Sequence, residues 1–486
     1  MLFNSFTFAV FLPTVVVVHF LLPHRFRWIW QLVASYTFYM WWRVDYALLL
    51  VGSTVLDWFV ARKLHALPDS LKRTAWFATS IGTQLTLLFT FKYYNLFHGL
   101  GTRVAEAIGT DNPLPLSTLL LPVGISFYTF QTMSYVIDVW RRDLKAEPNL
   151  FKFALFVSFW PQLVAGPIER AGSLLPQLFT HNPFDVDRTI SGLRLAAWGL
   201  FKKVVVADRL APIADAIYSD PHHVSGFATV VGTLCFGWQI WLDFSGYSDI
   251  AVGTARIFGI ELMRNFHQPH LATSVSDYWA RWHVSLTTWF RDYLYFGLGG
   301  SRSGFTSKYR NILLVFTCSG LWHGANWSVA LWGFFNGLWL VIDDWTRPAR
   351  LRFYDAIGLS GWPRVHHVLS VVCTFGIMYL TYPFFRAANL RAWWGMMSHI
   401  HTGWSFDPQR LGMLFDRIDM APALFFATIL LIPVAEVGEY LHRSERVGAW
   451  TARQPAFVRG LRDLALVFGT LVLGRWSDAP FVYFQF

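Results

Sequence analysis

One segment of the chain, residues 311–342, carries no Asp, Glu, Lys or Arg over its whole length. As a single straight helix it would be about 48 Å long, whereas the hydrocarbon core of a bilayer is about 30 Å thick. The segment must therefore tilt steeply, extend beyond the membrane or break, and Gly320 and Gly324 on either side of His323 are the candidate break points. Irregular backbone at membrane depth is tolerated only where it packs in protein or lines a wet cavity. A histidine at such a break is the sharpest indication of a functional site in this chain.

Further apolar runs follow one another along the chain and predict an all-α polytopic membrane protein. They occupy residues 6–22, 28–42, 44–60, 75–91, 117–138, 151–165, 190–207, 226–243, 366–385, 421–437 and 461–473. The chain is 54% hydrophobic and 14% charged, against about 25% charged residues in an ordinary soluble domain. A spanning helix needs about 20 apolar residues, and several runs are shorter. We therefore expect roughly 10–13 transmembrane helices, some tilted or re-entrant.

The net charge of +10 comes from Lys and Arg in short loops between the runs, as the positive-inside rule predicts, rather than from a nucleic-acid-binding surface. The loops after the first, third and fifth runs are basic, which places the N-terminus outside the cytoplasm. The first run lacks a basic segment before it and a cleavage site after it, so we interpret it as a span and not as a signal peptide. The three cysteines lie within apolar runs at spacings that suit neither disulfides nor zinc. No metal site is expected.

Without a repeat or a flexible linker, residues 1–474 are predicted to form one membrane domain, followed by an aromatic tail at 475–486. The long polar stretch at 265–310 is the exception among the loops. Within it Ser274 and Asp277 have the spacing of a capping box that begins a helix. Aromatic and apolar side chains then recur at helical spacing up to Tyr293, which predicts one amphipathic helix with His283 at the margin of its apolar face.

Two histidines are the candidate catalytic residues. Histidine within a spanning segment is costly and therefore functional by default, and its pKa suits proton transfer near neutral pH. His283 and His323 lie in consecutive segments and could meet across a cavity. The alternative is that each is a neutral, hydrogen-bonded structural residue. Asp243, in the sequence WLDFSGYSD at 241–249, could line a polar route, hold an ion or, as we favour, brace neighbouring helices.

Five ordered motifs resemble the membrane-bound O-acyltransferases, in particular the bacterial branch that acetylates alginate and other cell-envelope polymers. They are PVGISFYTFQ (122–131), PQLVAGPIER (161–170), DFSGYSDI (243–250), DYWARWHVSL (277–286) and SGLWHGA (319–325). The resemblance implies a ring of tilted helices around a central tunnel, with His323 as the catalytic residue and His283 near the tunnel constriction. It also implies that tunnel-lining or supporting roles fall to Asn265, Asp277, Trp322 and Asp243. One departure is the sequence NFHQPH at 265–270, where many relatives have NFNxPY.

The same resemblance implies the substrates and partners. Acetyl-CoA would be the cytoplasmic donor, with no permanently bound cofactor, and a periplasmic acetyltransferase partner would deliver the acetyl group to a polysaccharide. The protein would lie in the bacterial inner membrane among its lipids. The C-terminal sequence FVYFQF resembles the Phe-x-Tyr tails of related systems, which makes Tyr483 a candidate first acyl acceptor. The alternative for this tail is an interfacial anchor.

Two other function classes remain open at this stage. A transporter or channel could use intramembrane His and Asp as a proton route, but it would be expected to show an inverted repeat. An acyltransferase acting on a lipid or protein would keep the chemistry and change the acceptor. Among polysaccharides, alginate, cellulose, peptidoglycan and other exopolysaccharides all remain candidates.

Overall fold

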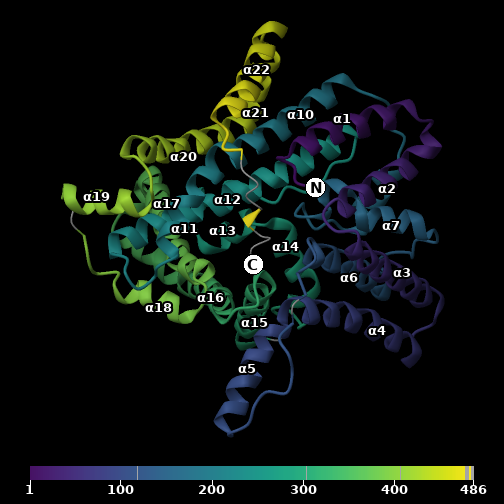
Figure 1. Cartoon of the computed structure of the whole chain (residues 1–486), viewed down its shortest axis with the longest axis horizontal. Coiled ribbons are helices and arrows are strands. Elements are labelled where there is room, and N and C mark those ends of the chain that lie inside the picture. The colour runs from purple at the N-terminus through teal and green to yellow at the C-terminus, as the bar shows by residue number, and fades with distance from the viewer. Residues whose placement is uncertain (118, 303, 405–406, 477–480, 483–486) are drawn as a thin grey trace. The chain divides into compact units, whose positions relative to one another are not determined.

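The computed structural model describes residues 1–117, 119–302, 304–404, 407–476 and 481–482 (Figure 1). All regular elements in these ranges are helical, which confirms the all-α prediction for the part described. The chain divides into two compact units, one made of residues 1–196 and 248–263 and the other of 197–247 and 264–486. Helices α10 (Val186–Leu200) and α12 (Gly226–Ile257) each contribute residues to both units.

The first unit contains helices that correspond to the N-terminal apolar runs. They are α1 (Phe6–Leu21), α2 (His24–Met40), α3 (Asp45–Ala66), α4 (Leu71–Leu88), α5 (Tyr94–Ala107), α6 (Ile125–Arg141), α7 (Leu150–Ser158), α8 (Trp160–Leu163) and α9 (Ala171–Phe179). Some buried polar side chains in this unit pair with one another. The carboxylate of Asp57 on α3, for example, accepts hydrogen bonds from Ser80 Oγ at 2.6 Å and Gln84 Nε2 at 2.5 Å.

Two predicted helices of the first unit are shorter than the sequence pattern indicated. The run at 117–138 becomes helical only at Ile125, because Pro122 and Gly124, whose φ is +78°, hold the chain in a turn before it. The run at 151–165 is interrupted after Ser158, where Phe159 leaves the helical conformation just ahead of Pro161. Hydrophobicity alone does not reveal either interruption.

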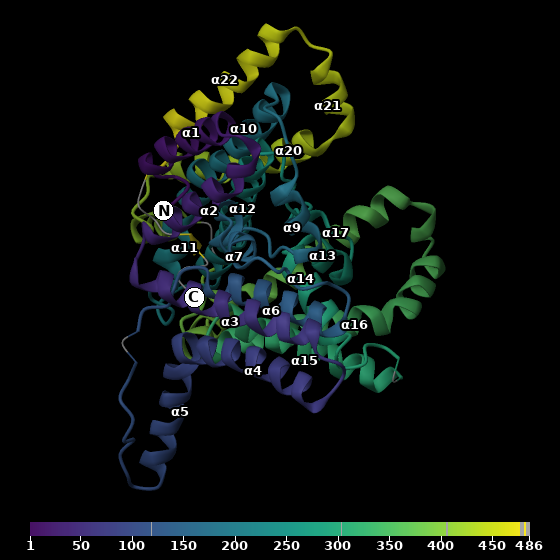
Figure 2. The same cartoon turned by 90° about the vertical axis from the view of Figure 1, so that its right-hand side faces the viewer.

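The second unit contains most of α12, the preceding helix α11 and all helices after α12. They are α11 (Asp208–Tyr218), α13 (Val275–Arg281), α14 (Val284–Trp289), α15 (Phe305–His323), α16 (Trp327–Ala356), α17 (Pro363–Arg386), α18 (Leu390–Ser398), α19 (Pro408–Arg417), α20 (Pro422–Arg443), α21 (Glu445–Ala452) and α22 (Ala456–Leu473). Short π-helical segments occur at Phe89–Tyr93, Phe201–Ala207 and Phe290–Tyr295, and 3-10 turns at Pro269–Leu271 and Leu359–Gly361. Helix α16 packs against both α15 and α17 (Figure 2).

Of the three options that the length of the charge-free segment at 311–342 allowed, the structure shows a break. Helix α15 ends at His323, Gly324 is extended, and Asn326 caps the start of α16 by accepting a hydrogen bond from the Ser328 amide at 3.0 Å. The prediction of a break at Gly320 was wrong, since Gly320 lies inside α15. Its role is instead to allow α15 and α16 to approach closely.

The single amphipathic helix predicted from Ser274 to Tyr293 was also wrong, although its start is confirmed. Ser274 caps α13 by accepting a hydrogen bond from the Asp277 amide at 3.0 Å. The helix then stops at Arg281, and His283 adopts a left-handed conformation with φ of +42° before α14 begins. Helical periodicity of the side chains therefore continues through a backbone break that the pattern cannot detect.

Membrane character is visible in three helices. Among the residues described, α12, α17 and α20 are long and apolar enough to cross a bilayer, whereas α1 is apolar but shorter. Large apolar side chains project outward from α17, α20 and other helices, whereas α12 is mostly buried. On α20, for example, Leu430, Val434 and Val437 are more than half exposed. An outer surface of this kind suits contact with lipid.

Candidate functional site

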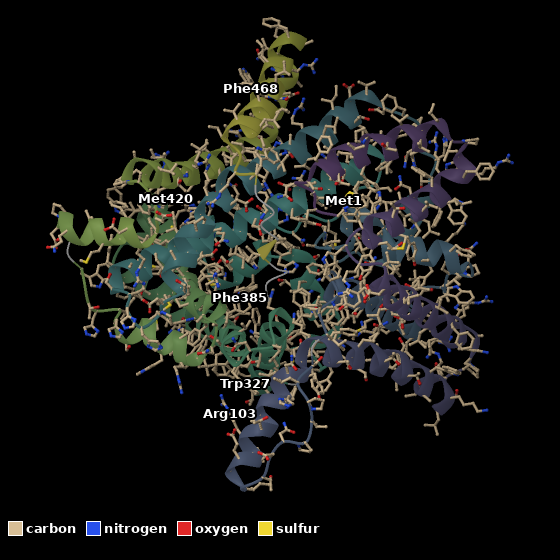
Figure 3. All side chains as sticks on the ribbon, in the orientation of Figure 1. Met1, Arg103, Trp327, Phe385, Met420 and Phe468 are labelled. Carbon is tan, nitrogen blue, oxygen red and sulfur yellow. The ribbon has the colours of Figure 1, made fainter. Side chains whose placement is uncertain are left out.

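His323 is the last residue of α15, and its side chain is enclosed by aromatic rings. Only 3% of its surface is exposed. The centroid of its ring lies 4.9 Å from Trp322, 5.2 Å from Trp332 and 5.5 Å from Phe385, which is labelled in Figure 3. Trp332 comes from α16 and Phe385 from α17, so three helices restrict the orientation of the imidazole. A ring held in this way is pre-organised for a reaction shielded from bulk water.

The position of His323 is set by a glycine contact between α15 and α16. A Cβ atom on Gly320 would lie 2.5 Å from the carbonyl oxygen of Val329 and 3.0 Å from Cα of Gly333. Gly333 in turn faces Gly320 and the Phe316 carbonyl so closely that it has no room for a side chain. The two backbones touch one helical turn before His323, and this contact fixes where the end of α15 points.

His283 lies in the turn between α13 and α14 and is 1% exposed. Its ring centroid lies 4.6 Å from that of Phe244 and 6.5 Å from that of Phe266. Burial lowers the pKa of His283, so its imidazole is neutral at neutral pH. A neutral imidazole has one nitrogen that donates and one that accepts a hydrogen bond.

The segment that contains Asn265 holds the His283 turn in place. The Asn265 carbonyl oxygen accepts a hydrogen bond from the Val284 amide at 3.0 Å, and its Oδ1 accepts one from the Ser285 amide at 3.3 Å. The Arg281 carbonyl oxygen accepts one from the His267 amide at 2.9 Å. These bonds on both sides of His283 stabilise a backbone conformation that costs a non-glycine residue about 1–2 kcal/mol. The Nδ2 atom of Asn265 is buried, and no described residue accepts a hydrogen bond from it.

The two predicted histidines come together. The ring centroids of His283 and His323 are 6.2 Å apart, about twice a hydrogen-bond length. Trp322 lies beside both rings, with its centroid 6.0 Å from His283 and 4.9 Å from His323. One reacting oxygen atom between the imidazoles could contact both. Of the predicted supporting residues, Asn265 and Trp322 belong to this histidine pair and its immediate surroundings.

Asp243 belongs to a different structure, which we call the tail anchor and define by Lys203, Asp243, Phe244 and Tyr247. The Asp243 carboxylate pairs with Lys203 Nζ at 2.7 Å and accepts a hydrogen bond from the Val482 amide at 2.7 Å. The ring of Phe481 packs on Phe244 and Tyr247, with centroid distances of 5.4 and 4.9 Å.

Both tail residues of this contact, Phe481 and Val482, are buried. Of the three roles considered for Asp243, the observed contacts are those of bracing, and the partners include the C-terminal tail. Tyr483, the predicted acyl acceptor, lies outside the described residues.

Asp277 forms its hydrogen bonds within α13 and the residues just before it. Its carboxylate accepts hydrogen bonds from the Thr273 amide at 3.0 Å and from Arg281 Nε at 2.6 Å. Both partners are within four residues along the chain, so Asp277 supports the helix that leads into the His283 turn. It is a structural residue of this region.

Sequence reasoning missed two buried lysines that lie next to each other in the apolar run at 190–207. Lys203 also pairs with Asp208 at 2.8 Å, and Lys202 pairs with Glu439 at 3.1 Å. Glu439 accepts a further hydrogen bond from Trp198 Nε1 at 2.9 Å. The two lysines could have been recognised as charged residues within an apolar run, because a buried lysine in a membrane protein requires a partner.

Comparison with known proteins identifies the family of this chain. The model of the MBOAT, membrane-bound O-acyltransferase family, matches residues 141–385, a range that includes both histidines. The chain is 38% identical to the probable alginate O-acetylase AlgI of Azotobacter vinelandii over 100% of both chains. It is 39% identical to the probable alginate O-acetylase AlgI of Pseudomonas aeruginosa over 82% of this chain and 74% of that one. It is 33% identical to a peptidoglycan O-acetyltransferase of Helicobacter pylori over 100% of this chain and 98% of that one.

These comparisons assign the chain, which is helical over the residues described, to a class of membrane enzyme. The chain belongs to the membrane-bound O-acyltransferase family and is an O-acyltransferase embedded in a membrane. The alternative of a transporter or channel is set aside by this membership.

Proposed function

We propose that this protein moves acetyl groups from cytoplasmic acetyl-CoA across the bacterial inner membrane for the O-acetylation of an exported polysaccharide. The observation that carries the proposal is the buried pair of His283 and His323, with ring centroids 6.2 Å apart. The relatives are named for O-acetylation of alginate and of peptidoglycan, which favours a carbohydrate polymer over a lipid or protein acceptor. Alginate is favoured among these because relatives of that name reach 39% identity.

Such a transfer requires a route through the protein, and we propose a ring of tilted, multi-pass helices around a tunnel that contains the histidine pair. Residues 1–474 would form this single catalytic domain, and residues 475–486 its tail. The family match from 141 to 385 supports one domain, since it includes residues of both compact units. The donor would enter from the cytoplasmic side and the acceptor from the other.

In the first chemical step His323 acts as general base. Its accepting nitrogen removes the proton from an acceptor hydroxyl, the oxygen attacks the thioester carbonyl, and the C–S bond breaks as the new C–O ester bond forms. The coenzyme A thiolate leaves and takes up a proton. A well-placed general base contributes about 10²–10⁴-fold to the rate. Neutral His283 orients the acceptor or donates to the developing oxyanion, and the buried Nδ2 of Asn265 is a second candidate donor.

Tyr483 is proposed as the first acceptor. It is bonded directly to Val482, which the tail anchor holds through Asp243. The same Phe244 ring that packs on Phe481 at 5.4 Å also packs on His283 at 4.6 Å. Phe481 is therefore separated from His283 by the single ring of Phe244, which supports a relay through the tyrosine two residues further on. A phenyl ester on Tyr483 would be activated enough to pass the acetyl group to a serine of a partner outside the membrane, and from there to the polysaccharide.

The test uses purified full-length protein in detergent with radiolabelled acetyl-CoA. Thioester consumption and covalently retained label are measured for the wild type, His323→Ala and Tyr483→Phe. The exposed residues His401 and Tyr440 provide matched controls as His401→Ala and Tyr440→Phe. We expect the wild type and both controls to carry label, and the two site variants to carry none.

Two outcomes would contradict parts of the proposal. Turnover without retained label would remove the tail relay and keep the acetyltransferase. Full turnover by His323→Ala, at normal membrane levels, would remove His323 as the base.

A further inference from the structure

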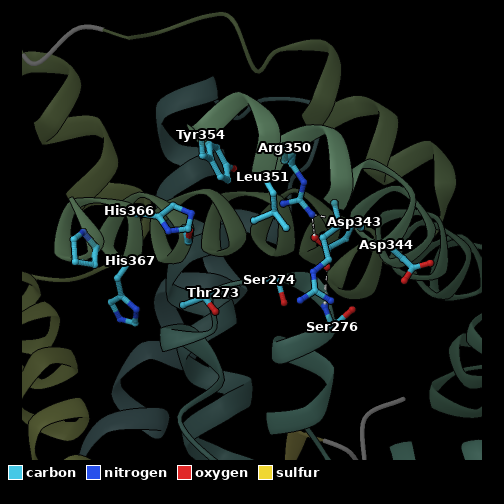
Figure 4. A pocket seen from close by; sticks show the side chains of 13 residues that line it. Thr273, Ser274, Ser276, Asp343, Asp344, Arg350, Leu351, Tyr354, His366 and His367 are labelled. Carbon is cyan, nitrogen blue, oxygen red and sulfur yellow. Dashed lines mark hydrogen bonds and ion pairs between the residues drawn. The ribbon is translucent and has the colours of Figure 1, made fainter. Parts of the chain in front are cut away.

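The second unit contains a polar cavity of about 480 Å³ away from the histidine pair (Figure 4). It lies between the start of α13, the C-terminal half of α16 and the start of α17. This volume is within the range of about 300–1,000 Å³ typical of small-molecule sites. The cavity is lined by Thr273, Ser274, Ser276, Asp343, Asp344, Arg347, Arg350, Leu351, Tyr354, Pro363, His366, His367 and Ser370. Cationic and hydroxyl groups dominate this lining.

The two carboxylates of the cavity are already neutralised. Asp343 pairs with Arg350 and accepts a hydrogen bond from the Ser276 amide at 3.3 Å. Asp344 pairs with Lys308 at 2.5 Å and accepts a hydrogen bond from the Tyr309 hydroxyl at 3.0 Å. Each acidic group therefore already has one directly bonded cation, Arg350 for Asp343 and Lys308 for Asp344.

Positive donors remain once these pairs are formed. Arg347 makes no hydrogen bond or ion pair with a residue in the described ranges, although its charge helps to lower the pKa of Asp344. The Nε of Arg350 is buried, and within the described chain nothing accepts from it. His366 and His367 add two imidazoles to the same wall. Guanidinium groups with free donors, surrounded by hydroxyls, match the geometry and charge of a phosphate.

We propose that this cavity binds a phosphate group, supplied by the nucleotide end of the acyl donor or by an anionic lipid headgroup. The nucleotide source is favoured by the two helices that connect the cavity to His323. Helix α16 begins just after His323 and reaches Arg347 about 30 Å further on. Helix α17 starts at the cavity with Pro363, and near its other end it carries Phe385, whose ring lies 5.5 Å from His323.

This arrangement matches the shape of coenzyme A, which has its thioester and its phosphates at opposite ends of an extended molecule. The stretch at 343–364 also contains four arginines, and basic stretches of this kind face the cytoplasm, where acetyl-CoA is found. The nucleotide assignment rests on the proposed acetyltransferase function, whereas phosphate binding itself does not.

The test measures binding by the purified full-length protein of coenzyme A, and of vesicles of phosphatidylglycerol against phosphatidylcholine. The variants are Arg347→Ala and, as a matched control, Arg352→Ala, because Arg352 is exposed on the same helix and does not line the cavity. Loss of charged hydrogen bonds to phosphate should weaken binding about tenfold to a hundredfold. We expect Arg347→Ala to lose coenzyme A affinity and to raise KM for acetyl-CoA more than it lowers kcat. Arg352→Ala should behave as the wild type.

The outcomes distinguish coenzyme A from lipid as the source of the phosphate. They also distinguish failure of the phosphate site from failure of the proposed acetyltransferase function. Loss of preference for phosphatidylglycerol with unchanged coenzyme A affinity would assign the cavity to lipid. Unchanged binding of both probes by a well-folded Arg347→Ala variant would overturn the phosphate site, even if His323-dependent transfer is intact. Conversely, Arg347-dependent binding of coenzyme A without His323-dependent transfer would overturn the proposed function and retain the site.

Discussion

The imidazole of His283 lies with its ring centroid 6.2 Å from that of His323, and the indole of Trp322 lies beside both. His283 reaches this position from a left-handed turn and His323 from the end of a helix. Each ring is enclosed by other aromatic rings, so neither can move far without displacing its neighbours. Because different elements hold the two histidines, the role of each can be tested by its own mutation.

Replacement of His323 should abolish the chemistry and leave the fold intact. His323→Gln keeps a polar side chain of similar size but provides no base near neutral pH, so we expect kcat to fall about 10²–10⁴-fold. Acetyl-CoA turnover by purified protein measures the effect. Size-exclusion profiles that match the wild type exclude misfolding, and wild-type turnover by this variant would contradict the assignment.

Replacement of His283 should separate its backbone role from its chemical role. Asn tolerates the left-handed conformation, whereas Val does not. We expect His283→Asn to unfold at the wild-type temperature with reduced kcat. His283→Val should be destabilised by about 1–2 kcal/mol as well. Thermal unfolding and turnover are measured together, and equal stability of the two variants would show that the turn does not constrain this position.

A methyl group added at the glycine contact between α15 and α16 should impair the histidine pair by moving the end of α15. A Cβ on Gly320 would lie 2.5 Å from the Val329 carbonyl oxygen, so Gly320→Ala should force the helices apart at a cost of about 1–3 kcal/mol. His323 would shift with the end of α15, and turnover should fall. Gly376→Ala is the control, because nothing lies within 4 Å of a Cβ at that helical position. Equal thermal stability of both variants would contradict the packing argument.

Disruption of the tail anchor should release the C-terminus. Asp243→Ala removes both the charge that pairs with Lys203 and the oxygen that accepts from the Val482 amide, and breaking one partner of a buried pair costs about 3–5 kcal/mol. Because Lys203 also pairs with Asp208, the fold around it should persist while the tail loosens. Limited proteolysis with mass spectrometry of the C-terminus should show faster cleavage than in Asp416→Ala, a control at an exposed aspartate on α19. A tail protected equally in both variants would show that Asp243 does not hold it.

Several features of the fold and site could be predicted because their causes are local. The length of the charge-free segment at 311–342 left a break as one of three options, and the chain breaks at Gly324, just before the helix cap at Asn326. Ser274 begins a helix because its hydroxyl can accept from the amide three residues on. His323 was identifiable because an ionisable residue in an uncharged segment is costly unless it has a function.

Other features were missed because they depend on segments far apart in the chain. The helix predicted through His283 stops because the Asn265 segment forms hydrogen bonds with the backbone on either side of His283. The periodicity of the side chains cannot reveal that partner, which lies elsewhere in the chain. Gly320 was taken for a break, yet its significance appears only when Gly333 lies opposite. The two lysines at 202 and 203 were visible as an anomaly, but their carboxylate partners could not be chosen from the sequence.

The sequence by itself determined the helical, membrane-embedded class of this protein and the residue types able to transfer a proton, because hydrophobicity, charge and helix signals act over a few turns of chain. Only the tertiary structure decided that His283 meets His323, that Asp243 holds the tail through Val482, and that Arg347 faces a cavity whose acids are already paired. These relationships arise from packing between helices, where the energy of a contact depends on a distant partner and leaves no periodic signal along the chain.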